Sequence, residues 1–180
     1  MTSVFSEWVT RVHGDDISDP SGLGCWSGIT LRGKDKAKLS IITAYRVCAG
    51  SIRTAPIGSS FAREHEFFKE SGTVHPNPRK AFFDDISVTI KALQKADHKI
   101  LLMFDANEHL VEGQALDIFV KALNLHDMQG SDPAPSTYIG TDDRRLDYMF
   151  GCADVLKATA QQGTLAYSVG PASDHRGLFV

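Results

Sequence analysis

The apolar run ILLMF, residues 100–104, is the sequence feature that most limits the possible fold. Five such residues in succession predict a buried strand. The run ends abruptly in the polar segment DANEH, residues 105–109. Catalytic and ligand-binding groups gather at strand ends, because the sheet fixes the backbone while the loop lets side chains reach a cleft. Asp105 and Asn107 are therefore candidate site residues, and the alternative is an ordinary turn or helix cap.

Other segments predict a layered protein in which helices and strands alternate irregularly. The helix over 79–96 has the clearest pattern, because its apolar residues recur at intervals of three and four. Strands occur both in adjacent pairs and across helices, which favours an α/β or α+β sandwich with mixed sheets. We expect helices over 59–70, 79–96 and 114–124, and strands over 26–33, 39–45, 100–104, 145–150, 155–159 and from 177 onward.

Composition and charge exclude several classes of protein. The 180 residues suit about one domain, and the formal net charge of -3 provides no global basic surface, so phosphate recognition would have to be local. We find no apolar run of membrane-spanning length and no signal peptide, so we expect no membrane partner. The three cysteines are odd in number and far apart, which predicts reduced thiols in an intracellular protein, nuclear or cytoplasmic and not secreted.

A second polar cluster lies in the segment RRLDYMFG, residues 144–151. Strand alternation places Asp147 on the face opposite to its neighbours Leu146 and Tyr148. A carboxylate in the middle of a strand is unfavourable to bury unless it has a partner. The segment therefore predicts either a paired functional carboxylate or an edge strand with a solvated one.

A third polar cluster is SDHRG, residues 173–177, just before the last expected strand. Asp174 offers a carboxylate for a cation, and His175 offers an imidazole that titrates near neutrality. Taken alone, such a segment is also typical of a surface turn.

The order of the three clusters resembles the C-terminal part of the DNase I-like endonuclease/exonuclease/phosphatase superfamily. That family includes exonuclease III-type abasic endonucleases and the endonuclease domains of non-LTR retroelements. Its members have a strand ending Gly-Asp-Phe-Asn, then an Arg-Ile-Asp-Tyr strand, then a terminal Ser-Asp-His. LSIITAYRVC resembles the family strand whose tyrosine contacts the scissile phosphate, which indicates Tyr45, and STYIG (136–140) resembles the threonine-bearing loop. The resemblance covers about residues 26–180.

The resemblance implies a DNase I-like four-layer α-β-β-α sandwich with mixed sheets, present here as a single, N-terminally truncated domain over residues 1–180. Family members carry an Asn and a Glu before the tyrosine strand, and that Glu is the main Mg²⁺ ligand. Only 44 residues precede Tyr45, and Glu7 in FSEWV does not resemble the glutamate motif. Phe104 and Ala106 also replace the family's Gly and Phe.

The resemblance also implies catalytic roles for five residues. Asp105 would orient or deprotonate the attacking water, and Asn107 would hold that water or a phosphate oxygen. His175, kept charged and oriented by Asp147, would donate to a non-bridging phosphate oxygen. Tyr45 would contact the phosphate.

Asp105 and Asp174 would hold Mg²⁺ or Mn²⁺, since Mg²⁺ often binds through one or two carboxylates plus substrate phosphates. We assign Glu108 and His109 no catalytic role. The cations expected to meet a nucleic-acid backbone are Arg46, Arg79, Lys80, Arg144 and Arg145.

The expected function is that of a monomeric, Mg²⁺-dependent phosphodiesterase. DNA is the expected substrate. The expected activity is that of a retroelement-type or abasic endonuclease. Two alternatives stay open. One is a phosphatase or lipid phosphodiesterase of the same superfamily, and the other is a non-catalytic remnant that binds nucleic acid weakly.

Overall fold

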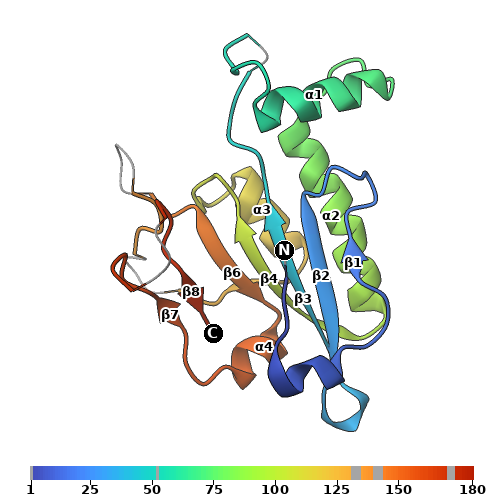
Figure 1. Ribbon diagram of the computed structural model, residues 1–180, viewed down its shortest axis with the longest axis vertical. Coiled ribbons are helices and arrows are strands. Elements are labelled where there is room, and N and C mark those ends of the chain that lie inside the picture. The colour runs from blue at the N-terminus through green and yellow to red at the C-terminus, as the bar shows by residue number, and fades with distance from the viewer. Residues whose placement is uncertain (1, 52, 131–134, 140–143, 170–172) are drawn as a thin grey trace.

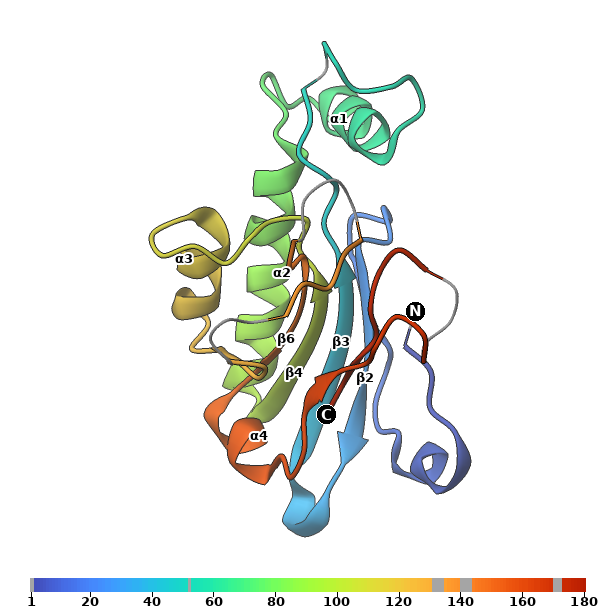
Figure 2. The same ribbon diagram turned by 90° about the vertical axis from the view of Figure 1, so that its left-hand side faces the viewer.

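A six-stranded mixed sheet forms the centre of the protein, with helices on one face and a small two-stranded sheet on the other (Figures 1 and 2). The computed structural model describes residues 2–51, 53–130, 135–139, 144–169 and 173–180. The large sheet has the order β1-β2-β3-β4-β6-β5, and the small sheet pairs β7 with β8. The strands are β1 (Ile17–Ser18), β2 (Trp26–Arg32), β3 (Lys38–Tyr45), β4 (His98–Asp105), β5 (His126–Asp127), β6 (Asp147–Gly151), β7 (Gly163–Thr164) and β8 (Leu178–Phe179). The helices are α1 (Ser60–Glu70), α2 (Pro78–Lys95), α3 (Ala115–Ala122) and α4 (Ala153–Ala158), with short 3-10 turns at Ser6–Arg11 and Lys34–Lys36.

Strand β4 lies in the middle of the large sheet, as its apolar sequence predicts. It runs parallel to β3 and antiparallel to β6, while β2 and β3 form an antiparallel pair. Ile100 and Leu102 have no exposed surface. The mixed sheet that the sequence predicts is therefore confirmed, and its parallel β3–β4 pair is joined by the long crossover that contains α1 and α2.

Helix α2 covers one face of the sheet. Asn77 caps it by accepting a hydrogen bond from the backbone N–H of Lys80, and Pro78 occupies the first turn, where its missing N–H has no consequence. The apolar stripe turns inward, and Phe82 stacks on Phe104 of β4 at 5.3 Å between ring centroids. Figure 2 shows α2 and α3 together on this side of the sheet.

The opposite face of the sheet carries a smaller apolar cluster. Leu101, Met128 and Met149 are its buried members, and Leu178 of β8 packs against them. Within the described residues, the second sheet of the expected sandwich consists of β7 and β8. Helices α2 and α3 therefore enclose the larger core, and the small sheet, together with Val155 of α4, covers part of the other face.

The strand expected over 155–159 was wrong, because Ala153–Ala158 is helical. Val155 and the neighbouring leucine favour a strand locally, but the alanines, Asp154 and Lys157 tolerate a helix, and Val155 packs toward Met149. The two-residue strands β1, β5 and β7 were not predicted, because so short a segment has no readable alternation.

Two findings concern the cysteines and the search for membrane-spanning helices. Cys25, Cys48 and Cys152 are all free, as expected. None of the helices in the described part of the chain has the length and apolar character needed to cross a bilayer.

The packing of α2 predicts a strong contrast between its two faces. Ile86→Ala should lower the free energy of unfolding by about 2–5 kcal/mol, because Ile86 is fully buried and truncation leaves a cavity. Val88→Ala, on the exposed face of the same helix, should change it by less than about 0.5 kcal/mol. Urea denaturation of both variants measures the difference, and equal losses would contradict this packing.

Candidate functional site

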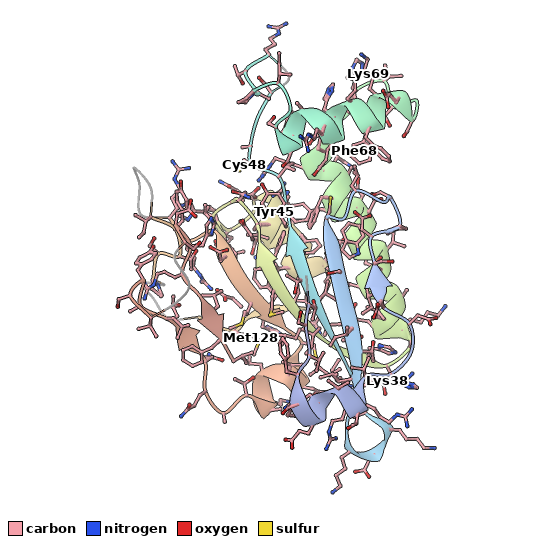
Figure 3. All side chains as sticks on the ribbon, in the orientation of Figure 1. Lys38, Tyr45, Cys48, Phe68, Lys69 and Met128 are labelled. Atoms are coloured by element: carbon pink, nitrogen blue, oxygen red, sulfur yellow. The ribbon has the colours of Figure 1, made fainter. Side chains whose placement is uncertain are left out.

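Three strands present their polar ends in one row across the large sheet. Tyr45 of β3 pairs in register with Asp105 of β4, and Asp105 pairs with Asp147 of β6. Residues paired in register point to the same face of a sheet. The fold therefore brings together three residues that lie far apart in the sequence, at the edge where Tyr45 is labelled in Figure 3.

His175 completes this row from outside the large sheet. Its Nδ1 lies 2.8 Å from Oδ2 of Asp147, so the carboxylate fixes the orientation of the ring. The ring of Tyr138 lies beside the imidazole, with 5.2 Å between centroids. Asp147, expected in the middle of a strand, is the first residue of β6, and it has the imidazole partner expected for it.

The hydroxyl of Thr137 positions Asp147. It is fully buried and accepts hydrogen bonds from the backbone N–H groups of Leu146 and Asp147, at 2.9 and 3.0 Å. The backbone of Thr137 also accepts from the N–H of Arg176, next to His175. The sequence analysis noted this threonine only as part of a loop and gave it no role, because nothing local indicates which strand its hydroxyl contacts.

Asp105 is the most perturbed carboxyl group in this row. Burial and the charge of Asp147 raise its pKa to about 6, although the N–H of Asn107 donates to Asp105 Oδ1 and opposes the shift. Burial lowers the pKa of His175, but the hydrogen bond and the charge of Asp147 outweigh it, so the net shift is upward. The row is therefore electronegative and favours the charged form of the imidazole.

A divalent cation fits this donor set. Ligand atoms of Asp105, Asp147 and His175 all lie within 4.8 Å of one another. Carboxylate oxygens are the ligands that Mg²⁺ and Mn²⁺ prefer, and a bound cation would relieve the repulsion that raises the pKa of Asp105.

Asp174, expected as the second metal ligand, is placed differently. Its side chain is exposed and does not belong to that group of ligand atoms, while its backbone carbonyl accepts from the N–H of Ile139. Asp147, expected only to orient His175, is the carboxylate that pairs directly with Asp105.

Asn107 lies next to the row, but its carboxamide is occupied by the neighbouring loop. Its Nδ2 donates to the carbonyl oxygen of Arg46 at 2.8 Å, and its Oδ1 accepts from Sγ of Cys48 at 3.2 Å. The residue has a φ of 47°, a left-handed conformation that asparagine tolerates better than most residues. In this arrangement Asn107 ties the loop after β4 to the loop after β3.

A cavity of about 380 Å³ opens in front of the row. Tyr45, Asp105 and Asp147 line it, and Arg176 adds a cation that the sequence analysis did not single out, although it belongs to the SDHRG segment. Burial and the neighbouring Cys48 raise the pKa of Tyr45 to about 12, so its hydroxyl stays protonated and can donate. The cavity therefore offers both an anionic end for a cation and donors for an anion.

Two of the arginines expected on the nucleic-acid surface are buried instead. Arg46 is 4% exposed and pairs with Glu108 at 2.6 Å, and Arg145 pairs with both oxygens of Asp127 at 2.6 and 2.7 Å. Their partners are remote in the sequence, so the pairing could not be predicted. Glu108, as expected, lies outside the row; its other oxygen accepts from the N–H of Leu116 at the start of α3.

The raised pKa of Asp105 predicts that Asp105→Asn stabilises the metal-free protein at pH 8, by on the order of 1 kcal/mol after allowance for partial exposure. Above about pH 6 the carboxylate is ionised against burial and Asp147, and the amide removes that penalty. Below about pH 4 the carboxyl is protonated in the folded and unfolded chains alike, so the gain should vanish. Thermal denaturation across this pH range is the measurement, and a gain that is constant with pH would contradict it.

The ion pair makes a second prediction. Asp147→Asn should lower the pKa of His175, because the burial that remains disfavours the imidazolium. Asp154→Asn, which removes an exposed carboxylate paired with Lys99 instead, should leave the His175 titration unchanged. NMR titration of the His175 ring protons measures both, and equal effects would refute the pairing.

Comparison with known proteins identifies the fold. No family model and no curated protein matches the sequence. The endonuclease domain of TRAS1, a telomere-specific non-LTR retrotransposon, superposes with a TM-score of 0.58 at 17% identity, covering 97% of this chain and 69% of that one. The 3'-5' exonuclease NExo from Neisseria meningitidis gives 0.61 at 14% identity, covering 93% and 68%. The human Nocturnin catalytic domain gives 0.54 at 16% identity, covering 94% and 60%.

The chain thus spans 60–69% of the length of these three structures. A further structure of similar fold, with a TM-score of 0.51, is an endonuclease/exonuclease/phosphatase from Beutenbergia cavernae. The expected fold is confirmed: this chain shares the DNase I-like fold of these solved structures.

Proposed function

We propose that the protein is a metal-dependent phosphodiesterase that hydrolyses nucleic acid, with DNA as its substrate. The observation that carries the proposal is the hydrogen-bonded Asp147–His175 pair, whose ligand atoms lie within 4.8 Å of the protonatable carboxyl of Asp105 at the edge of one cavity. Hydrolysis of a phosphodiester requires a positioned water, donors at the phosphoryl oxygens and a route for a proton. The three groups supply these requirements together.

Asp105 would orient the attacking water and accept its proton. In the metal-free protein the pKa of Asp105 is about 6, much closer to neutrality than that of an ordinary carboxyl, and a bound cation would lower it. His175 would donate from Nε2 to a phosphate oxygen, since Nδ1 is engaged with Asp147. The neutral hydroxyl of Tyr45 would donate to the same phosphate.

Mg²⁺ or Mn²⁺ would be held by the carboxylates of Asp105 and Asp147, with oxygens of the substrate completing the coordination. When bound, the metal neutralises charge on the phosphoryl group and lowers the pKa of a coordinated water. Asp147 would then contact both the metal and His175, since one of its oxygens already forms a hydrogen bond with the imidazole.

The proposal predicts that the purified protein nicks supercoiled plasmid in Mg²⁺ or Mn²⁺. Asp105→Ala and His175→Ala should each lower the rate by about 10²-fold or more, because each removes a proton-transfer or phosphate-binding group. His109→Ala provides a matched control, since this exposed histidine follows the same strand and lies outside the cavity lining.

Nicking that survives both substitutions would exclude this site as its source. A folded wild-type protein that neither nicks DNA nor binds Mg²⁺ or Mn²⁺ in millimolar calorimetry would instead support a non-catalytic remnant. Hydrolysis of phosphomonoesters or lipid phosphodiesters in preference to DNA would reassign the substrate while keeping the site.

A further inference from the structure

A second cavity, of about 540 Å³, lies between α1, the loop after β3 and the start of α2. We call it the basic pocket, because Arg46, His65, Arg79 and Lys80 line it and none of its described lining residues is acidic. Figure 1 shows α1 lying across the end of α2 from which the pocket residues come. This cavity is separate from the one that contains Asp105 and Asp147.

The basic pocket carries more positive charge than its neighbours neutralise. Arg46 and Arg79 contact the same carboxylate oxygen of Glu108, at 2.6 and 2.7 Å, so one negative charge serves two guanidinium groups. Burial and the charge of Arg79 lower the pKa of Arg46, although the hydrogen bond that Arg46 donates to Glu108 opposes the shift. An anion in the pocket would complete this charge balance.

His65 adds an imidazole to the pocket lining. Its Nδ1 is buried, and no atom of the described residues forms a hydrogen bond with it. Its ring stacks beside Phe61, with 6.4 Å between centroids. A buried ring nitrogen left unpaired is unfavourable, and a rotation of the ring toward an oxyanion in the pocket would give it a partner.

A third hollow, of about 340 Å³, neighbours both cavities. It shares Tyr45 with the cavity of the Asp105 row, and it shares Gly50 and Phe61 with the basic pocket. The three hollows therefore follow one another, from the anionic row to the cationic pocket. Such an arrangement suits an extended ligand with more than one phosphate.

We propose that the basic pocket binds a second phosphate of the same nucleic-acid strand whose scissile phosphate lies at Asp105 and His175. The inference rests on the proposed function and adds to it that the substrate is an extended polynucleotide, not a single phosphate ester. It also explains how a chain of net charge -3 holds a polyanion, since the contact is local.

The test compares two charge reversals on α2. Lys80→Glu changes a residue that lines the pocket, and Lys91→Glu changes an exposed lysine roughly 16 Å further along the same helix. Both alter the net charge equally. Lys80 loses only an exposed pair with Asp84, which contributes little to stability, so both variants should fold.

Fluorescence anisotropy with a labelled single-stranded DNA 10-mer, in EDTA, gives the affinity without cleavage. Lys80→Glu should weaken binding by about tenfold and reduce the slope of log K against log salt by about one, whereas Lys91→Glu should have little effect. Equal effects of the two variants, or no binding by the wild type, would overturn the inference.

Two further arms identify the ligand. In NMR titrations, the 10-mer should shift the His65 ring protons at lower concentration than inorganic phosphate, and Lys80→Glu should weaken both. If the protein bound anionic phospholipid vesicles in a way that depends on Lys80, and did not bind DNA, a polynucleotide ligand would be rejected.

The inference and the proposed function can fail separately. DNA binding that depends on Lys80 and persists in Asp105→Asn, in a protein that never cleaves, would retain the pocket and reject the hydrolase. Cleavage by the wild type with identical binding by Lys80→Glu and Lys91→Glu would retain the hydrolase and reject the pocket.

Discussion

The pairing of β4 with β6 places two carboxylates, Asp105 and Asp147, directly opposite each other, and the rest of the site depends on this contact. Like charges in opposing positions destabilise a sheet, so the register persists only because other interactions hold it. The imidazole of His175 neutralises one carboxylate, and the hydroxyl of Thr137 fixes the strand that carries it. The carboxylate of Asp105 has no such partner among the described residues, so a cation or a proton can bind there.

The site is connected to the core through one tyrosine. The ring of Tyr148 stacks on Phe150 in the buried face of β6, at 5.2 Å between centroids. Its hydroxyl accepts from the N–H of Leu110 and donates to the backbone carbonyls of Glu108 and Arg145. The loop that follows Asp105 is therefore held by a residue that also packs in the apolar interior, so loosening the core would displace the functional loop.

Much of the fold could be predicted because its main elements carry strong local patterns. The apolar run of β4 and the stripe of α2 predicted the centre of the sheet and its covering helix. The failure at 155–159 has a physical reason: so short a run, with β-branched residues only at its two ends, is decided by what it packs against, which the local sequence does not specify.

The part of the site that lies at strand ends could be predicted from the sequence. Asp105, Asp147, His175 and Tyr45 meet at one cavity, or border it through the Asp147 ion pair. Asp174 and the buried arginines could not be placed, because their environment depends on residues from distant segments. Pairing between remote positions follows from tertiary structure and has no signature in a single sequence.

The parallel pairing of β3 with β4 also bears on the order of folding. Tyr45 and Asp105 meet only after the intervening chain, with α1 and α2, has crossed the sheet, and His175 must then reach β6 from a separate hairpin. Contacts between residues so far apart form slowly, because loop closure is entropically unfavourable before they stabilise the structure. The functional row should thus be among the last parts to assemble, and partly folded chains would lack it while already exposing apolar strands that are prone to aggregation.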